Sequence, residues 1–321
     1  MKKTTIWLII AAILIVIGLL GGAIVMASAN WNFNLLSTER YQTVTHDVND
    51  DFDKIYVYGD TEKITFLVSD DGKCRVECYE NKKLPHSVSI EDGALIVKVS
   101  DTRKWYEKIT LMSFYSPKIT VYLPIAEYSL LKIESDTSDI SLPKDLFFKN
   151  IEVDVDTGDI DCFSSADEII MTASTGDIKL GGNTVKSLYI TTSTGDITLT
   201  SITCQENIAL AVNTGDITLT DVICKNLSSS GDTGRITLTR TIASEKFDIE
   251  RDTGDVVFEN SDAAEIYVTT DTGSIIGNLL SDKIFITKTD TGRIRVPSST
   301  TGGRCEITTD TGNIIISITK Q

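Results

Sequence analysis

Residues 190–220 read ITTSTGDITLTSITCQENIALAVNTGDITLT, and this stretch contains the same turn twice. The turn is one of ten related copies, which run from DTSDI at residues 136–140 to DTGNI at residues 310–314. Their threonines recur at intervals of 18 to 20 residues, at Thr137, Thr157, Thr175, Thr194, Thr214, Thr233, Thr253, Thr272, Thr291 and Thr311. A period this regular predicts a solenoid in which each copy packs only against its neighbours.

The apolar positions within one copy predict its strands. Ile197 and Leu199 follow one turn at a spacing of two, which places both side chains on one face of a strand. A second alternating stretch, such as 208–212, ends just before the next turn. About 19 residues leave no room for a helical crossover as well. The expected fold is therefore all-β: a single-stranded parallel β-helix with rungs of about 19 residues.

The N-terminus predicts a membrane segment. Met1, Lys2 and Lys3 precede an apolar run from Ile6 to Met26, which is long enough to cross a bilayer as a helix. The lysines should stay in the cytoplasm, so the remainder is expected outside the cytoplasmic membrane, with a single pass. Residues 27–29 also have the small-x-small form of a cleavage site, so the alternative is a signal peptide cleaved near Ala29 and a secreted protein.

The sequence divides into four segments. Residues 1–29 are the anchor or signal peptide, and residues 30–40 are a juxtamembrane connection. Residues 41–135 are expected to form an irregular β-structure that makes the N-terminal cap and first rungs, and 136–321 the regular repeats. The last repeat ends in Ile314–Ile318, and we expect it to be the terminal rung and to leave an edge strand open for pairing.

Charge and cysteine content narrow the class of protein. The formal net charge of -16 excludes nucleic acid as a partner, because phosphates need a basic surface. The six cysteines show neither a disulfide-scaffold pattern nor a metal-binding spacing. Cys204 and Cys224 each follow their Thr by the same interval, so they should be neighbours on adjacent rungs, either as buried thiols or as a disulfide.

Two columns of aspartates flank the turns. Stacked carboxylates repel one another, and calcium could relieve the repulsion. The simpler interpretation is a solvated, turn-forming ladder. No other cofactor is expected. The calcium candidates are Asp159, Asp177, Asp196, Asp216, Asp252 and Asp271.

An aromatic and locally basic stretch precedes the repeats. Such residues suit stacking on sugars or contact with a protein, or they could simply cap the open core of the first rung. The possible contact patch comprises Arg103, Lys104, Trp105, Tyr106, Phe114 and Tyr115.

The sequence offers no catalytic residues. Acids recur in every rung, as turn formation requires, rather than in one singular pair. His46 and His86 lie outside the repeats, and the sequence places no nucleophile beside them. A non-enzymatic protein is therefore predicted, with a polysaccharide-active β-helix enzyme as a weaker alternative.

The run of DTGDI-type turns, preceded by KITVYLP at residues 118–124, resembles the bacterial putative-adhesin family, a domain family of unknown function. The resemblance covers roughly residues 45–319. It implies a β-solenoid, with a right-handed coil, and a surface or cell-envelope role in adhesion or in envelope-stress sensing. It brings no established catalytic residues.

Together these features predict a membrane-anchored scaffold that presents a repetitive acidic surface to a cell-wall polymer, another surface or another protein. Many weak equivalent contacts on a repetitive rod gain strength by avidity. The alternative is an envelope-stress signalling or scaffold component that binds other membrane proteins.

Overall fold

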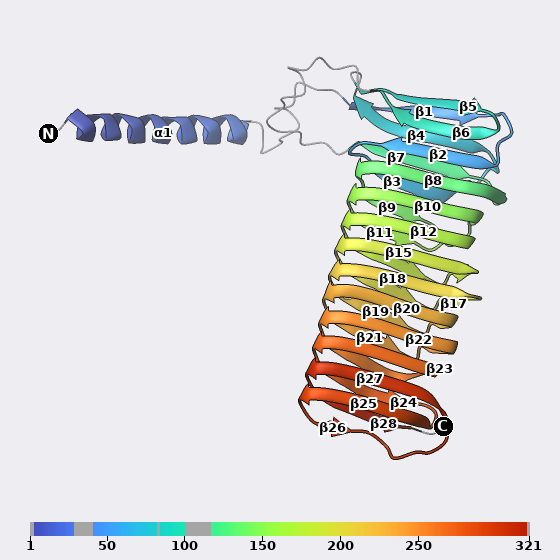
Figure 1. The fold of residues 1–321 in the computed structure, drawn as a ribbon. Coiled ribbons are helices and arrows are strands. Elements are labelled where there is room, and N and C mark those ends of the chain that lie inside the picture. Colours follow the sequence, from blue (N-terminus) through green and yellow to red (C-terminus); the bar gives the residue numbers. More distant parts are fainter. Residues whose placement is uncertain (1–2, 29–40, 82–83, 101–116, 320–321) are drawn as a thin grey trace.

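The computed structural model describes residues 3–28, 41–81, 84–100 and 117–319 (Figure 1). One helix, α1 (Lys3–Ser28), precedes a rod of stacked strands. Within α1 the segment Ile9–Ser28 is long and apolar enough to cross a membrane, and a signal sequence has the same character. This agrees with the apolar segment predicted from the sequence.

The regular part of the rod is built from rungs, each with one longer and one shorter strand. The longer strands form sheet B: β8 (Glu127–Thr137), β10 (Phe147–Thr157), β12 (Ser165–Thr175), β15 (Ser187–Thr194), β18 (Asn207–Thr214), β20 (Ile223–Thr233), β22 (Ile242–Thr253), β25 (Lys283–Thr291) and β27 (Gly303–Thr311). The shorter ones form sheet A: β9 (Ile140–Leu142), β11 (Ile160–Cys162), β13 (Ile178–Gly181), β16 (Ile197–Thr200), β19 (Ile217–Thr220), β21 (Ile236–Thr239), β24 (Ile275–Leu279), β26 (Ile294–Arg295) and β28 (Ile314–Ile318). Strand β23 (Val256–Thr272) begins in sheet A and ends in sheet B, and β14 (Thr184–Val185) and β17 (Thr203–Cys204) lie between the two strands of their rungs.

The repeat sets the register between rungs. Thr157 pairs with Thr137 on one side and with Thr175 on the other, in parallel strands. Alternate side chains of both sheets point inward, so the apolar columns merge into one continuous core along the rod. The predicted parallel β-solenoid is confirmed.

Glycine is required at the turns because successive turns touch. Gly195 donates a 3.0 Å hydrogen bond from its N–H to the Thr214 carbonyl and has a φ of 140°. A Cβ on Gly195 would collide with the carbonyl oxygen of Gly176 on the preceding rung. The glycine therefore permits both the backbone conformation and the close stacking of the turns.

The N-terminal end is irregular and partly antiparallel. Its strands are β1 (Tyr41–Val48), β2 (Lys54–Gly59), β3 (Lys63–Val68), β4 (Cys74–Asn81), β5 (His86–Glu91), β6 (Ala94–Val99) and β7 (Lys118–Leu123). The rung of β2 and β3 lies between the rung of β6 and β7 and the rung of β8 and β9. Strand β5 covers β6, and β4 covers β7, both antiparallel, with β1 outside β4. These antiparallel strands extend both sheets beyond the rung of β6 and β7, and we call this end of the rod the N-terminal cap.

The C-terminal end departs from the expected order of rungs. Strand β27 pairs with β23 on one side and with β25 on the other, and β28 likewise lies between β24 and β26. The prediction that the last repeat forms the terminal rung is therefore wrong. The repeat before it, with β25 and β26, forms the end of the rod (Figure 1). Ile294 is 45% exposed, because no further rung of the described residues covers its column.

All six cysteines are buried free thiols. Cys204 and Cys224 lie on adjacent rungs as predicted. The residues directly before them, Thr203 and Ile223, pair with each other in parallel strands. Cys305 takes the place of Ile266 in an inward column. The thiols act as small apolar core residues.

Candidate functional site

The aspartates that follow the turn glycines form a ladder that is part of the backbone hydrogen bonding. The Oδ1 atom of Asp177 accepts the N–H of Asp196 at 2.9 Å, and that of Asp196 accepts the N–H of Asp216 at 2.8 Å. Asp159 does the same for Asp177 at 2.9 Å. One carboxylate oxygen of each of these residues therefore accepts a backbone hydrogen bond from the next rung, which gives this column a structural role in the turns.

Asp252 and Asp271 belong to a different column. They precede the turn threonines, and the pairing of Thr253 with Thr272 makes them neighbours on adjacent rungs. The structure thus separates the six calcium candidates into a group of four and a group of two. Among the described residues, neither column contributes a group of three ligand atoms within coordinating reach of one another. Calcium binding at these turns stays a prediction.

The predicted aromatic contact patch lies outside the described residues. Arg103, Lys104, Trp105, Tyr106, Phe114 and Tyr115 all fall between β6 and β7, in residues 101–116.

The outer face of sheet B carries three shallow hollows that sequence reasoning missed. The first, of about 300 Å³, lies between Tyr58 and the acids Asp136 and Asp156. The second, of about 330 Å³, lies between Lys132 and Ile170 and continues from the first along β8, β10 and β12. They form a row along the length of the rod, on the face opposite to sheet A.

The third hollow, of about 300 Å³, is formed by small side chains on β18 and β20. Ala211 and Ser230 lie at its floor, with the ring of Tyr189 at one side and the carboxylates of Asp248 and Glu250 at the other. An exposed aromatic ring beside carboxylates and hydroxyls can stack on the apolar face of a sugar while accepting its hydroxyl hydrogens. We call the outward residues around the three hollows the sheet B face.

These hollows could be found only in part from the sequence. The repeat predicts which positions point outward, and small residues at two adjacent rungs are a signal for a depression.

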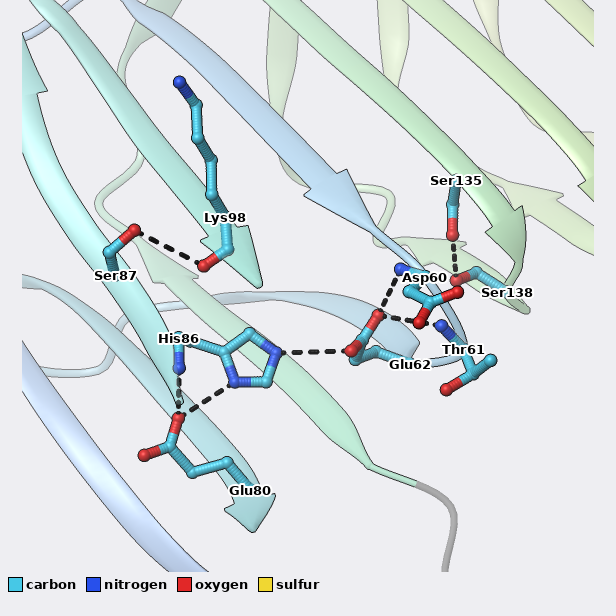
Figure 2. A network of polar contacts seen from close by, with 9 residues as sticks. All are labelled: Asp60, Thr61, Glu62, Glu80, His86, Ser87, Lys98, Ser135 and Ser138. Atoms are coloured by element: carbon cyan, nitrogen blue, oxygen red, sulfur yellow. Dashed lines mark hydrogen bonds and ion pairs between the residues drawn. The ribbon is translucent and has the colours of Figure 1, made fainter. Parts of the chain in front are cut away.

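A buried polar cluster lies in the N-terminal cap (Figure 2). His86 is the first residue of β5, Glu80 lies near the end of β4, and Glu62 lies in the connection between β2 and β3. The Nδ1 atom of His86 lies 2.9 Å from Glu80 Oε2, which also accepts the backbone N–H of His86 at 2.6 Å. The Nε2 atom lies 3.5 Å from Glu62 Oε1.

The backbone holds Glu62 in place from the other side. Its Oε2 atom accepts the N–H groups of Asp60 at 2.6 Å and Thr61 at 3.0 Å. Burial acts to raise the pKa of Glu62, but its polar contact with His86 and the hydrogen bond from Asp60 outweigh it and hold that pKa below the usual value. Burial acts to lower the pKa of His86, but its polar contacts with the carboxylates of Glu62 and Glu80 raise that pKa overall.

Cys78 also faces this cluster. This thiol beside His86 was not predicted from the sequence, because the two residues belong to different strands. The alternation along β4 points Cys78 and Glu80 inward together, and β5 then brings His86 against them. One feature of the sequence could have indicated the cluster: Cys78 and Glu80 are two residues apart on one strand face, and His86 follows shortly after them.

Comparison with known proteins identifies the class. The family model for the Toastrack DUF4097 domain matches residues 52–209 and 205–321, which together span most of the chain. This protein is therefore a β-solenoid of the Toastrack DUF4097 family with an apolar N-terminal helix. No curated protein matches the sequence.

Three solved structures are similar to this chain at low identity. A putative adhesin from Bacteroides fragilis is 18% identical, with a TM-score of 0.41, and the match covers 86% of this chain and 97% of that one. A putative adhesin from Parabacteroides distasonis is 12% identical, with a TM-score of 0.46 and coverages of 85% and 98%. A putative lipid binding protein from the same species is 17% identical, with a TM-score of 0.48 and coverages of 75% and 97%.

Proposed function

We propose that this protein is a membrane-anchored extracytoplasmic scaffold whose sheet B face binds a cell-wall polysaccharide. The observation that carries the proposal is the row of three hollows on one face of a rigid rod, with Tyr58 and Tyr189 beside clustered carboxylates. A polymer is the ligand that suits such a row, since it can occupy neighbouring hollows with successive units. Helix α1 serves as the anchor in this proposal.

The chemistry of the face favours carbohydrate over nucleic acid or anionic lipid. Glu134, Asp154 and Glu250 line the hollows and would repel phosphate. Carboxylates accept hydrogen bonds from sugar hydroxyls, and they attract the amino groups of partly deacetylated polymers. Each hollow is shallow, so each contact is weak, and binding along the row depends on avidity.

The test is co-sedimentation of the full-length protein, held in nanodiscs, with isolated cell-wall sacculi. Saturable binding is expected, and Tyr189→Ala should weaken it about tenfold through the loss of one stacking contact. The matched control is Thr218→Ala, since Thr218 is exposed on the outer face of sheet A. Equal weakening by both variants, or no binding by the unaltered protein, would overturn the proposal.

The same assay, repeated with chelator and with added calcium, tests whether calcium takes part in binding. Binding that is lost in chelator and restored by calcium would assign the turn aspartates as ligands. Binding unchanged by chelator would leave them as turn-forming residues and keep the sheet B face as the contact surface.

A further inference from the structure

The buried cluster of the N-terminal cap has the donor atoms of a transition-metal site. Cys78, Glu80 and His86 are all buried, and one ligand atom from each lies within 4.8 Å of the other two. This is the one such group that the described residues form. It occurs once, outside the repeats, so turn formation does not account for it.

The cluster keeps a net negative charge even when His86 is protonated. Glu62 and Glu80 place two carboxylates around one imidazole, and among the described residues their ion pairs are with His86. The Nε2 atom of His86 is buried and has no hydrogen-bond partner, because Glu62 Oε1 lies beyond hydrogen-bond distance at 3.5 Å. Buried negative charge of this kind is costly unless it is paired or bound to a metal.

We propose that Cys78 Sγ, a carboxylate oxygen of Glu80 and His86 Nδ1 bind a divalent transition-metal ion, with Zn²⁺ as the preferred ion. Sulfur, imidazole and carboxylate are the three ligand types that protein Zn²⁺ sites use. Two nitrogen or oxygen ligands of a tetrahedral Zn²⁺ lie about 3.3 Å apart, given bonds of about 2.0 Å. The 2.9 Å between Nδ1 and Glu80 Oε2 is close to this spacing.

Glu62 completes the arrangement as the outer carboxylate. When Nδ1 binds the metal, Nε2 carries the proton and points at Glu62 Oε1 (Figure 2). Metal-bound histidines commonly donate their second N–H to a carboxylate in this way, which fixes the ring and its tautomer. The Asp60 and Thr61 amides in turn fix Glu62.

The ligand set selects among ions. A thiolate and an imidazole favour Zn²⁺ over Ca²⁺ and Mg²⁺, which prefer oxygen ligands. Binding releases the thiol proton of Cys78 to solvent, and a doubly protonated His86 also releases its Nδ1 proton while Nε2 keeps its own. The bound ion joins β4 to β5 and orients the β2–β3 connection, so it should stabilise the cap.

The experiment uses the full-length protein in detergent, stripped with chelator and then titrated with Zn²⁺, Ca²⁺ or Mg²⁺. One Zn²⁺ per chain is expected by elemental analysis after desalting, with a rise in Tm that Ca²⁺ and Mg²⁺ do not produce. Cys78→Ser and His86→Gln should abolish retention of Zn²⁺. Glu62→Gln should weaken the affinity about 10- to 100-fold, as an outer partner of a ligating histidine does.

The matched control is Cys74→Ser, because Cys74 is buried on the same face of β4 and is not part of the cluster. It should retain Zn²⁺ fully. The unaltered protein loaded with Co²⁺ supplies a readout that needs no variant to fold, since cysteine ligation produces a thiolate-to-cobalt charge-transfer band. Absence of that band, or equal Zn²⁺ retention by Cys78→Ser and Cys74→Ser, would overturn the proposal.

Discussion

The ammonium group of Lys283 lies 2.6 Å from Oδ1 of Asp262, although strand β27 lies between the strands that carry them. Lys283 pairs in register with Gly303 of β27, and its side chain is 2% exposed. A Cβ on Gly303 would collide with the carbonyl of Ala264 in β23. The ion pair thus connects two strands across the last repeat and fixes the order of the rungs at the end of the rod.

Lys283→Met should destabilise the protein by about 3–5 kcal/mol, because it leaves the buried carboxylate of Asp262 without its partner. Urea unfolding followed by circular dichroism measures the change. The control is Lys288→Met on the same strand, since Lys288 pairs with Asp290 at the exposed surface and should cost about 0–1 kcal/mol. Equal losses in both variants would show that the buried pair has no special role.

Within the regular rungs, Arg251 likewise reaches past a glycine on the intervening rung, as Lys283 does at the end of the rod. Its guanidinium is buried, and Nη1 donates a 2.9 Å hydrogen bond to the Val212 carbonyl two rungs away. Gly231 lies between them in register with Arg251, and a Cβ there would collide with both groups. A glycine on the intervening rung thus accommodates a long basic side chain in both cases.

Gly195→Ala should destabilise the rod by about 3 kcal/mol or more, from backbone strain at a φ of 140° and from collision with the Gly176 carbonyl. Thermal unfolding measures it. Gly72→Ala is the comparison, because that position also has a positive φ, of 70°, but nothing lies near the added Cβ. Gly72→Ala should lower the free energy of unfolding by only about 1 kcal/mol, from the left-handed backbone conformation alone. A similar Tm for the two variants would contradict the tight stacking of the turns.

The aspartate ladder predicts a difference between two substitutions at one position. Asp196→Ala removes the acceptor of the Asp216 N–H and should cost about 1 kcal/mol, whereas Asp196→Asn keeps a carbonyl acceptor and should stay near the unaltered stability. Urea midpoints measured in chelator would show this difference. If Asn were as destabilising as Ala, the charge rather than the hydrogen bond would be what position 196 supplies.

The sequence predicted the solenoid and its register because the repeat encodes them directly. Every copy of the turn carries the same stacking information, so the repeat cannot specify which rung lies next to which. The order at the C-terminal end depends on single features outside the motif, namely Lys283, Asp262 and Gly303.

The cluster of Cys78, Glu80 and His86 escaped sequence reasoning for a related reason. Its members come from β4 and β5 of the irregular cap, which pair antiparallel with their neighbours. No repeated motif in the sequence indicates these pairings. The hollows of the sheet B face depend likewise on the sizes of outward side chains on successive rungs. Neither feature leaves a periodic signal in the sequence.

The buried thiols predict a loss of stability at alkaline pH. Burial raises the pKa of Cys162 to about 12 and that of Cys224 to about 12, whereas unfolded thiols titrate near their usual value of 9.0. Below about pH 9 both states keep the protons, so the thiols give no pH dependence. Above about pH 9 the unfolded chain releases protons that the folded chain retains, so the free energy of unfolding falls as pH rises toward 12. Urea unfolding between pH 8 and pH 11 checks this, and Cys162→Ala should flatten the decline while lowering stability at pH 8 through the lost packing. An identical pH slope in the variant would mean that the Cys162 thiol titrates alike in the folded and unfolded chain.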